Sequence, residues 1–144
     1  MAYFYTFNPP ESLNGTIHTK PGITNSPPDG RLGKYQLPYG PYWEAHFTWL
    51  CYHPELQVIK RIEDSVLGHF RFRCSAIGAG MTEWLMNTTW QEIKDYVLII
   101  TKDTNTNIID FGEGPWNMTK IQKEIYSRII KGEINDSPTH TSRI

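Results

Sequence analysis

The sequence predicts an α+β domain in which helices pack on a mixed or antiparallel sheet. Aromatic residues concentrate in two short segments, residues 2–7 and 43–52, where large rings and partial alternation indicate strands. Longer segments with apolar residues at helical spacing follow them, most clearly at 54–70 and 117–131. The resulting order of short strands and amphipathic helices is typical of a small α+β domain.

The N-terminal part is expected to form two strands and a short helix. After the strand at 2–7, a proline- and glycine-rich turn leads into a second strand at 18–24. Because Pro21 has no N–H, this second strand should lie at a sheet edge there. A short helix from about 29 to 36 follows and carries Arg31 in its first turn.

The C-terminal half is expected to be mostly helical. Residues 83–86 suggest a short extended piece, and a capping-box pattern then opens a helix from about 89 to 101. The apolar end of that helix, 97–100, could instead be a strand, because periodicity alone does not decide. Residues 102–116 are polar and rich in turn residues, and the last helix covers about 117 to 131.

Length and charge indicate one domain without an overall affinity for nucleic acid. The chain has 144 residues, with 14 basic and 15 acidic side chains, so a general nucleic-acid coat is excluded but a local basic cleft is not. Two cysteines are too few for a disulfide scaffold and suit a reducing compartment. The sequence has neither a membrane-length apolar run nor a secretory start, so we expect a cytoplasmic protein, in the host cytoplasm if viral.

Glu63 is the acidic residue with the most informative position. On the 54–70 helix it falls at the edge of the apolar stripe that should face the core. A carboxylate left unpaired there costs several kcal/mol, so it should find a cation, hydrogen-bond donors or a metal ion. A structural salt bridge to Arg31 or Arg61 is the simpler alternative.

Several other residues could contribute to the same chemistry. The Arg31 guanidinium can hold two phosphate oxygens, and Tyr35 follows one turn later on the same helix face. Lys20 could steady a developing negative charge, while Gly22 allows close approach to the backbone. Tyr5 can act as a general base only if a nearby cation or metal eases loss of its proton. Each of these residues alone would more simply be a core or surface residue.

In this order the segments resemble the GIY-YIG nuclease superfamily. Tyr3 to Phe7 resemble the first half of its signature, with Tyr5 at the tyrosine position and Tyr3 where glycine is usual. Lys20-Pro21-Gly22 resembles the second half in the branch that reads Lys-Ile-Gly. Three further segments are similar to the arginine helix, the glutamate helix and the piece that follows: residues 31–36, 62–70 and 83–85.

The resemblance implies a fold, a set of site residues and an activity. The fold would be a GIY-YIG-like three-stranded sheet flanked by helices over residues 1–103. Beyond the resemblance, the sequence itself predicts a helical extension at 104–132 and a flexible tail at 133–144. The activity would be DNA endonuclease cleavage with one Mg²⁺ (or Mn²⁺) held by Glu63. The catalytic residues would be Tyr5, Lys20, Arg31, Tyr35 and Glu63, and the substrate-binding residues would be His18, Gly22, Lys34 and His69.

Targeting and activity are left open by the sequence. Specificity for DNA would come from the cleft itself, from the last helix with its basic residues, from a homodimer or from a separate targeting partner; no membrane is implied. One alternative is a catalytically inactive module of the same fold that binds nucleic acid or another partner, from a phage, virus or mobile element. A second alternative is an unrelated α+β domain in which Glu63 and Arg31 form a structural ion pair.

Overall fold

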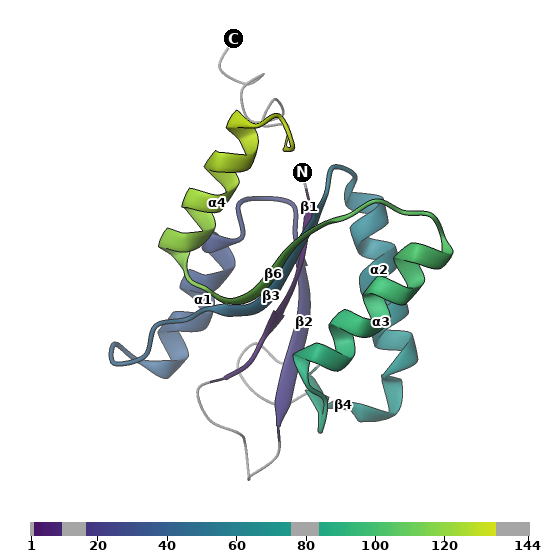
Figure 1. Ribbon diagram of the computed structural model, residues 1–144. Coiled ribbons are helices and arrows are strands. Elements are labelled where there is room, and N and C mark those ends of the chain that lie inside the picture. Colours follow the sequence, from purple (N-terminus) through teal and green to yellow (C-terminus); the bar gives the residue numbers. More distant parts are fainter. Residues whose placement is uncertain (1, 10–16, 76–83, 135–144) are drawn as a thin grey trace.

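The computed structural model of the chain describes residues 2–9, 17–75 and 84–134. These residues form an α+β domain in which one antiparallel sheet lies between two pairs of helices (Figure 1). The strand order is β4-β5-β2-β1-β3-β6. The strands are β1 Ala2–Phe7, β2 His18–Thr24, β3 Phe47–His53, β4 Cys74–Ser75, β5 Trp84–Met86 and β6 Ile109–Trp116.

Four helices cover the sheet. Helices α1 and α4 pack on one face, while α2 and α3 pack on the other (Figure 1). None of the helices in the described ranges is long and apolar enough to cross a membrane. Their bounds are α1 Asp29–Tyr39, α2 Leu56–His69, α3 Trp90–Asp103 and α4 Met118–Ile130.

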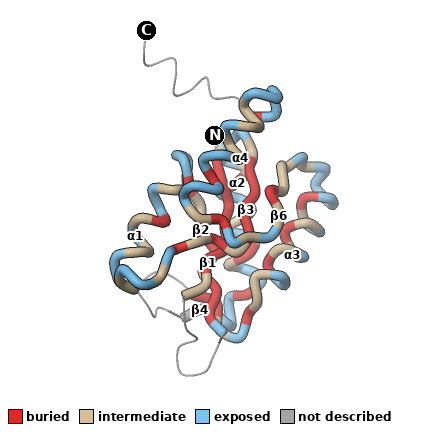
Figure 2. The backbone as a smooth tube through the Cα atoms, turned by 60° about the vertical axis from the view of Figure 1, so that its left-hand side comes forward, coloured by how far each residue is buried: buried red, intermediate tan, exposed pale blue. Residues whose placement is uncertain are grey.

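Alternation along β1 builds two separate cores. Tyr3, Tyr5 and Phe7 face α1 and α4 and belong to what we call the first core. Phe4 faces α2 and α3 in the second core, where it meets the Trp49 indole of β3 edge to face. Burial therefore concentrates along the central strands, and the exposed positions lie mainly on the helices and loops (Figure 2).

The expectation of a three-stranded sheet is wrong, because the described residues alone form a six-stranded sheet. The strand that the sequence hides most completely is β6, which lies within the segment 102–116 expected to be turn-rich. Gly112 has φ +89° and the β3–β6 register shifts twice, so β6 is an irregular edge strand. Its glycines and Pro115 produce a composition that is typical of turns rather than strands.

The predicted helices are confirmed, with small shifts at their ends. The capping box at the start of α3 is present, since Thr89 and Glu92 bond each other's backbone N–H groups. Residues 97–100 are helical, so the strand alternative for them is wrong. Asn117 caps α4, and Gly132, at φ +79°, follows its end.

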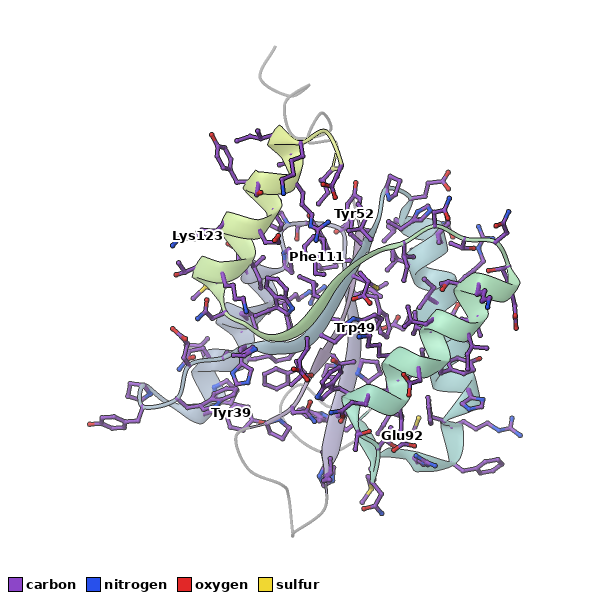
Figure 3. The ribbon with its side chains drawn as sticks, viewed as in Figure 1. Tyr39, Trp49, Tyr52, Glu92, Phe111 and Lys123 are labelled. Carbon is purple, nitrogen blue, oxygen red and sulfur yellow. The ribbon has the colours of Figure 1, made fainter. Side chains whose placement is uncertain are left out.

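The C-terminal segment is more than an added helix. The expected helical extension of residues 104–132 contains strand β6 before α4, and Phe111, Trp116 and Ile121 are buried in the first core. Figure 3 shows Phe111 in the layer between the sheet and α4. Of the expected flexible tail, Ile134 is packed in the same core, and residues 135–144 lie outside the described residues.

Candidate functional site

Tyr5 is fixed at the centre of the sheet. Its ring stacks on Phe47 of β3 with centroids 4.2 Å apart, and only 2% of the residue is exposed. On the other side Tyr5 is paired across β1 and β2 with Gly22, and a Cβ there would lie 2.3 Å from the phenol oxygen. The phenol therefore occupies the space that any other residue at position 22 would fill.

A second phenol meets the first. The Tyr5 and Tyr35 hydroxyl oxygens are 2.8 Å apart and share a hydrogen bond. Tyr35 itself stacks on Phe7 with centroids 4.2 Å apart and an interplanar angle of 18°. On one face of β1, Tyr5 thus supplies one phenol of the pair, and Phe7, two positions later, supports the ring of the other, Tyr35.

Helix α1 positions Tyr35 beside Tyr5. Leu32 is fully buried and holds the helix against the first core. Arg31 and Tyr35 are one turn apart, as expected, and Arg31 remains exposed to solvent. The Gln36 side chain ties the loop after α1 by bonding the backbone of Gly40, Trp43 and Ala45.

Burial and the neighbouring groups shift the pKa of the Tyr5 phenol in both directions. Burial raises the pKa of its phenol above the ordinary value, whereas the hydrogen bond from Tyr35 and the charge of Arg31 lower it. The charge of Glu63 raises it again. A single phenol is therefore under the influence of the arginine of α1 and the carboxylate of α2.

Tyr35 is the more strongly perturbed member of the pair. Burial raises its pKa far above the ordinary value, and the charge of Tyr5 and the hydrogen bond between them raise it further. The charge of Arg31 lowers the same pKa and that of Glu63 raises it. The hydrogen bond between the two phenols lowers the pKa of Tyr5 and raises that of Tyr35.

Glu63 lies where the helical pattern predicts. Ile59, Ile62 and Val66 of α2 are buried in the second core, and Glu63 is half-buried at the edge of that stripe. Asp64, the next residue, is exposed. The charge of Glu63 raises the pKa of both phenols, although α2 packs in the second core and Tyr5 and Tyr35 lie in the first.

The residues of β2 line the same face as the phenols. Lys20 is paired with Phe7 and Gly22 with Tyr5, so both sit on the α1 side of the sheet. Lys20 is half-buried, whereas His18 is 2% exposed. Among the described residues, β5 pairs with β2 only at His18 and Thr19, so no described strand pairs with Pro21 on the outer side of β2.

Two residues expected to bind substrate lie apart from the phenol pair. Lys34 is exposed on α1, in the position next to Tyr35. His69, at the end of α2, stacks its ring on Tyr96 of α3 with centroids 4.2 Å apart. His69 therefore belongs to an aromatic contact between two helices.

Sequence reasoning missed the residues that hold the phenols. Phe7 and Phe47 stack on Tyr35 and Tyr5, and neither was singled out. The alternation of Tyr3, Tyr5 and Phe7 was visible in the sequence and places them on one face. What it could not reveal is the register that sets Phe47 beside Phe7.

The donor set around the phenols can be tested against a divalent cation. Glu63 offers one carboxylate, and Mg²⁺ in proteins commonly takes one or two carboxylates together with substrate phosphate oxygens and several waters. Glu63 thus supplies one ligand of the type that Mg²⁺ takes, and the described residues would leave the other positions to water or a bound anion. Within the described residues no three or more histidines, cysteines or acidic residues lie close enough together to hold a metal ion by themselves.

Comparison of the chain with protein-family models, with curated proteins and with solved structures found no match.

Proposed function

We propose that the chain is a Mg²⁺- or Mn²⁺-dependent endonuclease of the GIY-YIG type that hydrolyses phosphodiester bonds in DNA. The observation that supports this most directly is the Tyr5–Tyr35 hydrogen bond, with the charges of Arg31 and Glu63 both acting on the paired phenols. A buried phenol whose pKa responds to both a guanidinium and a carboxylate supplies the types of group that a one-cation phosphodiester cleavage needs.

The residues divide the chemistry between them. Arg31 binds the phosphate oxygens and opposes the charge that develops there, with Lys20 assisting from β2. The Tyr5 phenolate accepts the proton of the attacking water, and the Tyr35 hydroxyl, which shares a hydrogen bond with the Tyr5 oxygen, would stabilise that phenolate by donating to it. A divalent cation held by Glu63 would polarise the phosphodiester and neutralise the leaving oxygen.

Nicking of supercoiled plasmid DNA tests the proposal. The purified full chain is incubated with plasmid and either Mg²⁺, Mn²⁺ or a chelator, alongside Glu63→Gln. We expect cation-dependent nicking that falls at least about 100-fold in the variant, because removal of one charge-stabilising group typically costs that much. Asp64→Asn is the matched control, since it removes a charge from the exposed neighbouring position of the same helix.

Stability measurements separate the alternatives. If Glu63 serves chemistry, Glu63→Gln should change the free energy of unfolding by less than about 1 kcal/mol. If it is instead half of a structural ion pair, the variant should lose about 3 kcal/mol or more. Unchanged nicking in a stable Glu63→Gln protein would contradict the proposal.

The second candidate is a catalytically inactive module of the same fold. It is favoured by the departures at Tyr3 and Pro21 from the usual signature and by the near-neutral charge of the chain. Such a module would bind DNA without nicking it under any cation condition. Gel-shift binding that persists in Glu63→Gln, with no nicking by either protein, would favour this candidate.

A further inference from the structure

A groove of about 470 Å³ lies at the end of the sheet where β6 leads into α4. The residues lining it come from the loop before β3, the start of α3 and the end of β6, and they include Trp43, His46, Trp90 and Glu113. Trp90 opens α3 two residues before Glu92, which is labelled in Figure 3. The volume lies in the range of small-molecule sites.

Two indoles supply the aromatic surface of the groove. Trp43 and Trp90 are both half-buried, so part of each ring system remains accessible. Trp43 is held from behind by edge-to-face contacts with Phe7 and Tyr39, at centroid distances of 5.8 and 5.2 Å. Indole has the aromatic face that attracts cations most strongly.

Two carboxylates give the groove its charge. Glu44 and Glu113 are exposed members of the lining, and the lining contains neither lysine nor arginine. Glu44 is oriented by a 3.0 Å hydrogen bond from the Asn117 amide. Lys120 lies over the Trp116 ring, 4.7 Å from its centroid, and is not part of the lining. The groove is therefore anionic as well as aromatic.

The backbone of the groove is preordered. A Cβ on Gly114 would lie 2.3 Å from the Phe47 carbonyl oxygen, so β6 approaches β3 as closely as glycine allows. Asn117 also caps α4 by accepting from the Lys120 N–H at 2.9 Å. These contacts hold Glu113 and Glu44 on elements that the fold already fixes.

We propose that this groove binds an organic ammonium ion, whose positive charge meets the indole faces of Trp43 and Trp90 and the carboxylates of Glu44 and Glu113. Two carboxylates, and a lining without lysine or arginine, disfavour a polynucleotide, whose phosphates the carboxylates would repel. A quaternary or methylated ammonium group suits such a site, because it is weakly hydrated and presents its charge to aromatic faces. The site is separate from the phenol pair and does not depend on the endonuclease proposal.

Titration of the full-length ¹⁵N-labelled protein with choline tests the site by NMR. The indole N–H signals are assigned with Trp43→Phe and Trp90→Phe. We expect saturable shifts of the Trp43 and Trp90 signals, whereas those of the fully buried Trp49 and Trp84 stay in place. Glu113→Gln should weaken choline binding about three-fold or more. Glu55→Gln, which removes a charge from an exposed residue just before α2, should leave the affinity unchanged.

Two comparison ligands make the test decisive. The neutral isostere 3,3-dimethylbutanol has the shape of choline without its charge, and we expect it to bind at least about ten-fold more weakly. A peptide containing trimethyllysine distinguishes a protein-borne ammonium group from a free one, because tighter binding of the peptide assigns the source to a partner. Equal binding of the isostere, or no saturable shift up to about 50 mM choline, would overturn the proposal.

Discussion

The ring of Tyr5 lies directly against Gly22 of the neighbouring strand, where a Cβ would come 2.3 Å from two atoms of the phenol. Such a distance is well inside van der Waals contact, so no other residue fits without moving the ring or the strand. Glycine at position 22 is therefore required for the Tyr5 ring to lie where its hydroxyl group bonds that of Tyr35.

Substituting Gly22 tests this relationship. Gly22→Ala should reduce the free energy of unfolding by about 1–3 kcal/mol, because the added methyl group overpacks a buried site. Urea denaturation measures the loss. Gly68→Ala in α2 is the control, since nothing lies within 4 Å of the added Cβ there and alanine favours the helix by about 0.5–1 kcal/mol. Equal stability of the two variants would contradict the predicted overlap.

Removing the two phenol oxygens one at a time tests their division of labour. Tyr5→Phe should reduce nicking more than Tyr35→Phe, because in the proposed mechanism Tyr5 accepts the proton and Tyr35 only hydrogen-bonds to it. Burial raises the pKa of Tyr5, so the phenolate is scarce at neutral pH, and its amount grows about ten-fold for each pH unit. The nicking rate should therefore rise with pH and show no plateau near neutrality. A plateau near pH 7, or a larger loss in Tyr35→Phe, would oppose this assignment.

Gln36 should contribute to stability, although no pattern in the sequence indicates this role. Its amide oxygen accepts from the Ala45 N–H at 2.6 Å, and its amide nitrogen donates to the carbonyls of Gly40 and Trp43. Gln36→Ala should cost about 1–3 kcal/mol, since it leaves backbone groups of this loop without their partner. Gln57→Ala on the exposed face of α2 provides the comparison and should cost less than about 0.5 kcal/mol. Equal losses would show that the loop is held by other contacts.

The Arg73–Glu92 pair makes a prediction about pH. Its nitrogen and oxygen are 2.9 Å apart, and hydrogen bonds from Arg73 and from the Thr89 backbone lower the pKa of Glu92. The stability this gives is present above the ordinary value of 4.5 and is lost as the pH falls through the lowered pKa. Glu92→Gln should cost about 0.5 kcal/mol at neutral pH, because both side chains are 43% exposed.

The measurement for Glu92 is urea denaturation of both proteins at several pH values. The difference between the wild type and Glu92→Gln should be constant above pH 4.5 and shrink below it. Arg73→Ala should abolish most of that difference, because the carboxylate then has no cation to meet. A difference that does not change with pH would assign the effect to the helix cap instead.

The sequence predicts the elements that depend on local pattern. The amphipathic stripe of α2 places Glu63 at the core edge, and the capping box marks the start of α3, and both features are present. The irregular β6 escapes prediction because Gly112 and Pro115 obscure its strand character. Local pattern thus identifies regular elements, while tertiary pairing creates the irregular ones.

The candidate site is predictable only in part for a related reason. Arg31 and Tyr35 lie one turn apart on a helix, so their shared face follows from the sequence. The meeting of Tyr35 with Tyr5, 30 positions away, depends on how α1 lies across β1. No spacing along the chain encodes how α1 docks on β1. Only the resemblance to a nuclease family therefore predicts that the two residues share a site.

The irregular margin formed by β6 also bears on how molecules of this protein meet one another. Pro115 lacks an amide hydrogen, and the left-handed Gly112 bends the strand, so its outer rim cannot present an unbroken ladder of donors and acceptors. A strand from another molecule could form few backbone hydrogen bonds along this edge. The features that concealed β6 from prediction therefore disfavour the pairing of another molecule's strand with this edge.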